Sequence, residues 1–186
     1  REGADAVVSR ALSRSHARQA DRLIAAVHRV LDGSPRLLAR VALSEVALCA
    51  DGLARMQRRA SRLLADELGR QILPDGGHVS RDPQALLDLL LDLLPLRQSF
   101  LSRSLEPPEA LLRAIDRMLP LLRLMRHPDA SLSHFNGMGT TEADHLTTLL
   151  IYDGAMVEAM RHAPFSGYER LEGGRVVVVA DVGGPP

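Results

Sequence analysis

The chain has 186 residues, of which 23 are basic and 23 acidic, and 46% of its residues are hydrophobic. This balanced charge gives no overall field that would hold the chain on nucleic acid or on an anionic membrane, so we predict no nucleic-acid partner. No apolar stretch is long enough to cross a bilayer, so we also predict no membrane span. The length suits one ordinary domain with a buried core.

The spacing of apolar residues predicts a mainly α-helical chain. Apolar residues recur every three or four positions through most of the sequence, which is the period of amphipathic helices. The predicted helices span residues 4–31 (as one helix or two), 34–50, 53–73, 84–103, 108–126 and 146–152. Asp-Gly pairs separate helices of similar length, which indicates antiparallel helical hairpins stacked in chain order.

The last part of the chain changes to a strand pattern. Residues 168–171 and 175–180 flank a Gly-Gly turn and predict a β-hairpin. The valines of the second strand do not alternate with polar residues, so both faces of the hairpin are expected to be covered. We therefore expect an internal piece of a longer protein, with a helical part at residues 1–164 and the start of a β-domain at residues 165–186.

The loop at residues 74–83 is the first candidate for a functional site. Gly76 and Gly77 allow a sharp turn, and His78 and Arg81 follow within a few residues. A histidine and a forked guanidinium donor in one loop could bind a carboxylate. A helix-capping or loop-bracing role fits the same two side chains equally well.

A second polar loop, residues 126–139, carries the only asparagine of the chain, Asn136. Its length and glycines are typical either of a cleft wall or of an ordered connector. We take Asn136 together with His78 and Arg81 as the candidate substrate-binding residues.

Two further polar groups have both a functional and a structural interpretation. Asp88 and Asp92 lie one helical turn apart, where they could form a carboxylate pair with one raised pKa or a solvated stripe. Four arginines of the third predicted helix could bind a polyanion or form a salt-bridged surface. These arginines are Arg55, Arg58, Arg59 and Arg62.

The sequence predicts neither a metal site nor a cofactor. Its seven histidines do not show the spacings of metal ligands, either with one another or with the single cysteine, Cys49. The segment 137–139 lacks the third glycine and the preceding strand that a dinucleotide-binding loop needs. Cys49 lies in an apolar run and is predicted to be a small buried residue.

Two segments resemble the heparinase II/III-like family of polysaccharide lyases. Residues 72–78 with Asp82-Pro83 and the leucine-rich helix that follows are similar to its helical toroid. Residues 166–171 leading into 176–181 are similar to the start of its β-sandwich, and Asn136-Gly137 falls in a polar loop between toroid helices. The resemblance implies part of an incomplete α/α toroid of antiparallel helical hairpins, with a C-terminal β-hairpin that begins a β-sandwich.

The same resemblance implies a function. It suggests that the parent protein binds or cleaves an acidic, uronate-containing polysaccharide by β-elimination, and that it is periplasmic. The family's catalytic Tyr-His pair corresponds here to Ala85 and Leu86, so we assign no catalytic residue and expect this chain alone to be inactive. The alternative is a non-catalytic helical scaffold for protein or glycan binding.

Overall fold

The computed structural model describes residues 32–49, 54–129, 131–139 and 160–184, and isolated positions at 7, 8, 11, 15, 18, 19, 22, 25, 26 and 149. Apart from those isolated positions, the helices predicted at 4–31 and 146–152 lie outside the described residues. The described elements are α2 (Ser34–Cys49), α3 (Ala54–Gln71), α4 (Pro83–Ser102), α5 (Glu109–Leu124), β1 (His162–Ala163), β2 (Tyr168–Gly173) and β3 (Val176–Asp181). The described part of the chain is therefore mainly helical with a small antiparallel sheet, which confirms the coarse fold prediction.

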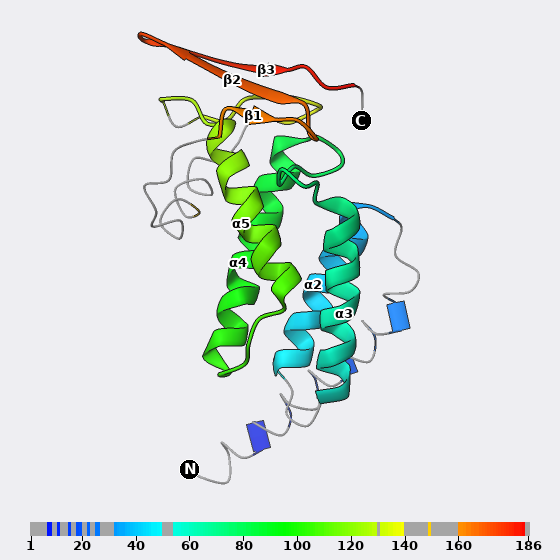
Figure 1. The fold of residues 1–186 in the computed structure, drawn as a ribbon. Coiled ribbons are helices and arrows are strands. Elements are labelled where there is room, and N and C mark those ends of the chain that lie inside the picture. The colour runs from blue at the N-terminus through cyan, green and yellow to red at the C-terminus, as the bar shows by residue number, and fades with distance from the viewer. Residues whose placement is uncertain are drawn as a thin grey trace.

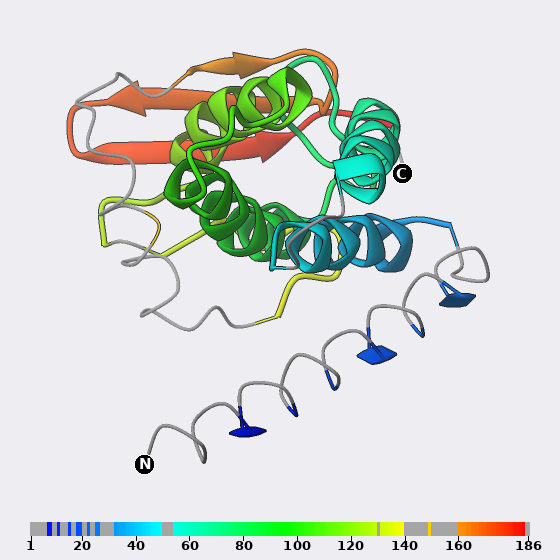
Figure 2. The same cartoon turned by 90° about the horizontal axis from the view of Figure 1, so that it is seen from below.

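The four described helices pack as two antiparallel hairpins around one core. α2 packs on α3 and α4 on α5, while α2 also contacts α4 and α3 contacts α5 (Figures 1 and 2). α4 accounts for much of this core, because Leu87, Leu90 and Leu93 are completely buried. Burial of such side chains is the main stabilising contribution to a bundle, at roughly 1.5–3 kcal/mol each. This explains why the sequence of α4 is almost continuous leucine.

The start of α4 is capped by the two residues before the predicted helix, Asp82 and Pro83. Asp82 has an extended backbone, and its side chain accepts a hydrogen bond from the backbone N–H of Gln84 at 2.8 Å. Pro83 occupies the first helical position, where the missing N–H costs nothing. The loop at residues 72–82 therefore ends in a fixed geometry.

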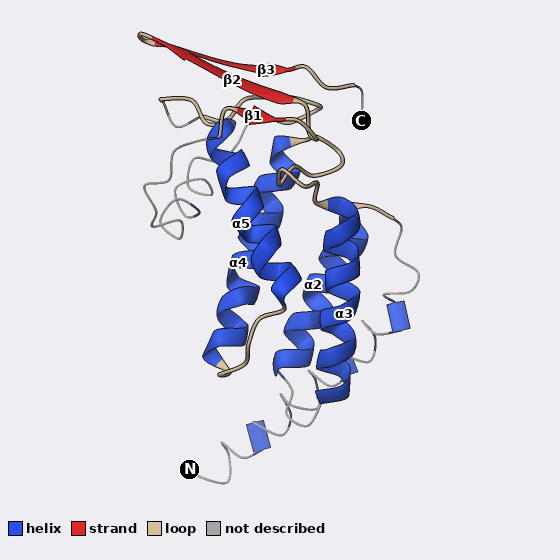
Figure 3. Cartoon of the chain, in the orientation of Figure 1, coloured by secondary structure: helices blue, strands red, loops and turns tan. Residues whose placement is uncertain are grey.

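The sheet lies across one end of the bundle, next to the loops 72–82 and 125–139 (Figures 1 and 3). Its order is β1-β2-β3 with antiparallel pairs, and Arg170 pairs with Val179 in the register. β1 pairs with β2 although it precedes residue 165, and the proposed division into 1–164 and 165–186 stays a prediction.

One face of the sheet packs on the helices and the other is exposed. Tyr168 and Arg170 of β2 are buried, and Val179 of β3 packs against the core. On the other face, Leu171 is 64% exposed and Val178 is 47% exposed. Within the described residues, the inner face is therefore covered as expected, whereas the outer face is not.

Cys49 differs from its prediction. It is the last residue of α2, where its side chain is exposed rather than buried. The apolar run around it predicts burial for the run as a whole, but it cannot tell which side of the final helical turn the cysteine occupies.

Candidate functional site at the sheet end of the bundle

The loop at residues 72–82 is a tight turn packed between α5 and the sheet. Gly76 has a φ of 91°, and a Cβ at this position would lie 2.0 Å from the backbone oxygen of Arg117. A Cβ on Gly77 would lie 2.5 Å from Cβ of Ser166. Both glycines are therefore required by close packing, because any side chain would push the loop away from its neighbours.

Arg81 makes the central ion pair of this region. Its side chain is buried, its Nε donates to the backbone oxygen of Ser166 at 2.8 Å, and its Nη2 pairs with the carboxylate of Asp181. The guanidinium carbon also lies 5.5 Å from the ring centroid of Tyr168. Arg81 does bind a carboxylate, as its chemistry suggests, but this carboxylate belongs to the last residue of β3.

Asn136 joins the same cluster from the other loop. Its Nδ2 group donates to the backbone oxygen of Arg81 at 2.8 Å, to Oδ2 of Asp181 at 3.0 Å and to the hydroxyl of Tyr168 at 3.1 Å. Asn136 has a positive φ of 51°, a conformation that asparagine tolerates better than most residues. The neighbouring Phe135 stacks on Tyr168 with ring centroids 5.4 Å apart. The structure thus brings two of the three predicted residues into contact.

Tyr168 lies at the centre of this cluster with its hydroxyl donating to the backbone oxygen of Arg81. Burial raises the pKa of Tyr168 above its usual value, although the hydrogen bond from Asn136 and the charge of Arg81 act in the opposite direction. A raised pKa keeps the phenol protonated at neutral pH. The hydroxyl therefore acts here as a hydrogen-bond donor rather than as a base.

His78 is buried beneath the loop and has partners on both ring nitrogens. Its Nε2 lies 3.0 Å from Oε1 of Gln71, which can only accept, so Nε2 carries the proton. Its Nδ1 accepts a hydrogen bond from the backbone N–H of Ser80 at 3.1 Å. Burial lowers the pKa of His78 despite the opposing charge of Asp82. His78 is therefore a neutral residue that braces the loop. Among the described residues, its side chain forms hydrogen bonds with Gln71 and Ser80 and none with Arg81 or Asn136.

Two further residues that fix the sheet to the bundle were not predicted as site residues. The Asp75 carboxylate accepts hydrogen bonds from the backbone N–H groups of Phe165 and Ser166, each at 2.7 Å. Arg170 donates from Nη1 to the backbone oxygens of Leu124 and Arg126 at the end of α5, at 2.9 and 2.6 Å. No local pattern predicts these contacts between sheet and bundle, because the two ends of each contact lie 44 or more positions apart.

The predicted carboxylate pair on α4 is separate from this cluster. Asp88 is exposed and accepts a hydrogen bond from Nε2 of Gln84 at 2.7 Å. Burial, and secondly the negative charge of Asp88, raise the pKa of Asp92. The predicted repulsion is present, and Gln84, the hydrogen-bond partner of Asp88, is not an acid-base group.

The arrangement at the sheet end braces the fold. Its charged and hydrogen-bonding groups are satisfied by one another, and Ala85 offers no group for proton transfer at the position where the lyase pattern has tyrosine. Among the described residues, no group of three His, Cys, Asp or Glu side chains is placed to hold a metal ion. In the same part of the chain, no helix is both long and apolar enough to span a bilayer.

The fold is a helical bundle capped by a small sheet. The polar loop residues His78, Arg81 and Asn136 form their hydrogen bonds with other groups of the chain. Over 127 residues, or 68% of its length, the chain is 39% identical to FtsZ-localized protein C of Caulobacter vibrioides (strain NA1000 / CB15N). The chain spans 22% of the length of that relative. No protein-family model and no solved structure matches the chain.

This similarity corrects the functional prediction from sequence. The resemblance to heparinase II/III-like proteins is wrong, and so is the predicted polysaccharide lyase, because the relative found is a protein named for its localisation with FtsZ. The acidic polysaccharide as partner and the periplasmic location depended on that resemblance and lose their basis with it. The misleading residues, such as Gly76, Gly77 and Tyr168, form a tight turn and an internal brace. Unrelated chains can share short motifs of this kind, because the motifs report local geometry rather than chemistry.

Proposed function

We propose that this chain is a non-catalytic binding module of a protein that localises with FtsZ during cell division. The observation that carries the proposal is the 39% identity to FtsZ-localized protein C over 127 residues. The structure supports binding over catalysis, because His78, Arg81 and Asn136 use their hydrogen bonds on groups of the chain itself. A rigid bundle of this kind presents helix faces and loops to a protein partner.

Localisation in cells tests this function. A fluorescent fusion of the 186-residue chain is expressed in cells that carry a differently labelled FtsZ, with the fluorescent protein alone as control. We expect the fusion to accumulate where FtsZ accumulates and to disperse when FtsZ is depleted. A fusion distributed like the fluorescent protein alone would refute the proposal. Pelleting of the purified chain with FtsZ polymers would show whether the contact is direct.

We also propose a larger architecture for the parent protein. The two helical hairpins would be consecutive units of an incomplete α/α toroid, and β2 and β3, within residues 165–186, would begin a β-sandwich. The exposed outer face of the sheet, with Leu171 and Val178, supports this proposal because a second sheet would cover it. A structure of the longer protein in which these side chains remain exposed would contradict it.

We propose a positioning role for the three predicted site residues. His78, Arg81 and Asn136 would hold the two loops at the sheet end in the shape that the module presents to its partner. Their bonds to Gln71, Asp181 and Tyr168 support this role. Loss of localisation in an Asn136→Ala variant that unfolds at the same urea concentration as the wild type would point instead to direct contact with the partner.

A further inference from the structure

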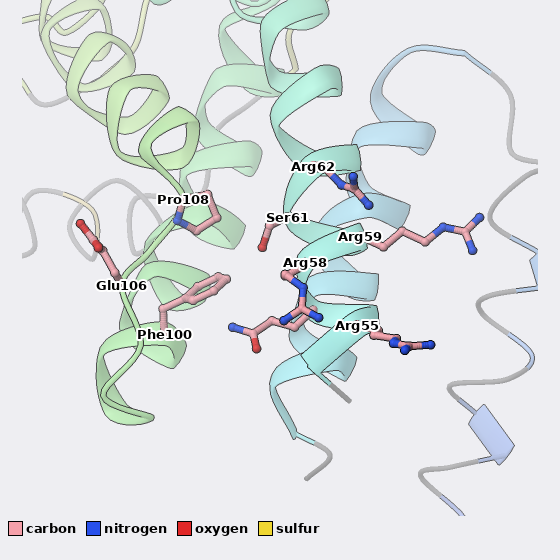
Figure 4. Close-up of a pocket in the computed structure, with 9 residues that line it drawn as sticks. Arg55, Arg58, Arg59, Ser61, Arg62, Phe100, Glu106 and Pro108 are labelled. Atoms are coloured by element: carbon pink, nitrogen blue, oxygen red, sulfur yellow. The ribbon is translucent and has the colours of Figure 1, made fainter. Parts of the chain in front are cut away.

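A surface cavity of about 680 Å³ lies among residues at the start of α3 and the end of α4. These ends of the two helices are at the opposite end of the bundle from the sheet (Figure 1). One wall is the first half of α3 and the other is formed by the end of α4 and the loop that leads to α5 (Figure 4). The α3 wall carries Arg55, Arg58, Arg59 and Arg62, and the facing wall carries Phe100 and Pro108. The size is that of a site that takes a ligand or a short peptide segment.

The positive charge of this wall does not serve the stability of α3. The first turn of α3 contains no acidic residue, while Arg55 and Arg58 lie within its first two turns. The N-terminal end of a helix carries a partial positive charge, so cations near it are unfavourable. The clustering of arginine here raises the local positive potential of a chain whose formal net charge is zero.

Within the described part of the chain, three arginines of the cavity, Arg55, Arg58 and Arg62, lack the acidic partners that arginines elsewhere in the bundle have. Arg113 pairs with Glu109, and Arg70 lies 3.5 Å from Glu67. Among the described residues, Arg55, Arg58 and Arg62 are exposed and form no ion pair, and Asp66, four positions after Arg62, does not pair with it. Three guanidinium groups are therefore available to a ligand.

The wall of the cavity that faces α3 limits which anions can bind there. This wall contains the buried Phe100, the half-buried Pro108 and the exposed Glu106. Ser61 and Arg58 lie on the side of α3 that faces it, whereas the side chains of Arg55, Arg59 and Arg62 extend away from it (Figure 4). A ligand that fills the cavity needs carboxylates towards α3 and apolar groups towards Phe100. Nucleic acid suits it less, because base stacking needs exposed aromatic rings. A membrane surface suits it less as well, since Phe100 is 1% exposed and cannot enter a bilayer.

We propose that this cavity binds an acidic protein segment in which glutamate or aspartate alternates with apolar residues. One carboxylate pairs with Arg58 on the side of α3 that faces Phe100 and Pro108, and others pair with Arg62 and Arg55 at the edge of the cavity (Figure 4). The apolar side chains lie against Phe100 and Pro108. The site depends on the cavity alone and not on localisation with FtsZ.

Peptide binding tests the proposal. The probe is a fluorescein-labelled peptide of alternating Glu and Leu, titrated with the 186-residue chain and followed by fluorescence anisotropy. We expect binding that weakens with added salt and that falls about tenfold or more in the Arg58→Gln/Arg62→Gln variant, as expected for lost charge-assisted hydrogen bonds. Arg175→Gln, which removes an exposed arginine of the sheet turn, is the matched control and leaves the affinity unchanged. Equal binding by the wild type and the double variant would overturn the proposal.

Charge reversal and two other anions separate this site from its alternatives. The Arg58→Glu/Arg62→Glu variant is expected to lose the Glu-Leu peptide and to gain a Lys-Leu peptide. Vesicles containing phosphatidylglycerol and single-stranded DNA are tested against the same variants. If either binds in an arginine-dependent way while the Glu-Leu peptide does not, the proposal is wrong and the cavity belongs to that anion.

Discussion

At the scale of single residues, a polar side chain in a loop is as often a brace as a reactive group. His78 has the chemistry of a base or a ligand, yet Gln71 and the backbone of Ser80 occupy both of its nitrogens. Arg81 has the chemistry of a carboxylate receptor, and its carboxylate is Asp181 of the same chain. The hydrogen-bond or ion-pair partner of such a side chain decides its role. For Arg81 that partner, Asp181, lies 100 positions away in the sequence.

The buried His78 predicts how the stability of the chain depends on pH. Its pKa in the folded state is lowered by burial, whereas in the unfolded chain it has its ordinary value of about 6.5. Below that pH the unfolded state binds a proton that the folded state does not, so this contribution to stability is full above pH 6.5 and is lost as the pH falls. The slope is at most about 1.4 kcal/mol per pH unit.

Urea unfolding at pH 7.5, 6.5 and 5.5 measures this effect. We expect His78→Gln to be less stable at pH 7.5 by about 1–2 kcal/mol, because the acceptor for the Ser80 N–H is lost, and to have a flatter pH dependence. His134→Gln, which replaces an exposed histidine, should keep the wild-type slope. A wild-type slope in His78→Gln would show that His78 is not the group responsible.

At the scale of elements, the described helices agree closely with those predicted from the sequence. In β3, by contrast, only the packing shows which face of the strand is buried. Its run of valines has no polar alternation, so the two faces of the strand cannot be told apart from the sequence. The register places Val179 opposite Arg170 on the inner face and leaves Val178 opposite Leu171 on the outer face.

This difference predicts opposite results for neighbouring substitutions in β3. Val178→Lys should change the free energy of unfolding by less than about 0.5 kcal/mol and reduce self-association, because it places a charge on an exposed apolar face. Val179→Lys should destabilise by about 2 kcal/mol or more, because it buries an ammonium group against the core. Urea unfolding and concentration-dependent light scattering measure the two effects. Similar losses of stability in both variants would mean that the outer face is covered.

At the scale of the whole molecule, long-range contacts attach the sheet to the bundle. Asp75 holds the turn before β2, Arg81 holds the end of β3, and Arg170 holds β2 to the end of α5. Each uses a charged group that is at most 9% exposed. Removal of one partner of a buried charge pair leaves the other without compensation, which is costly.

Arg81→Gln is therefore expected to loosen the sheet before the helices. We expect a loss of about 3 kcal/mol in the free energy of unfolding, since the Asp181 carboxylate loses its partner. Relative to the wild type, amide hydrogen exchange should become faster in residues 162–181. The exchange of the α4 amides should be accelerated less. In Arg113→Gln, which breaks an exposed pair with Glu109, stability should change by less than about 1 kcal/mol. Equal acceleration in the sheet and in α4 would show instead that the two unfold as one unit.

The sequence by itself determined the four described helices and the hairpin, because helix period, capping by Asp82-Pro83 and the glycine turn are local properties. It also singled out Arg81 and Asn136, which the fold brings together. Only the tertiary structure decided that Asp181 and Tyr168 complete their cluster, that Asp75 and Arg170 hold the sheet, and that Arg58 of α3 lies on the side that faces Phe100 and Pro108 (Figure 4). The physical reason is that these contacts join residues far apart in the chain, and no local pattern encodes which distant group will satisfy a charge.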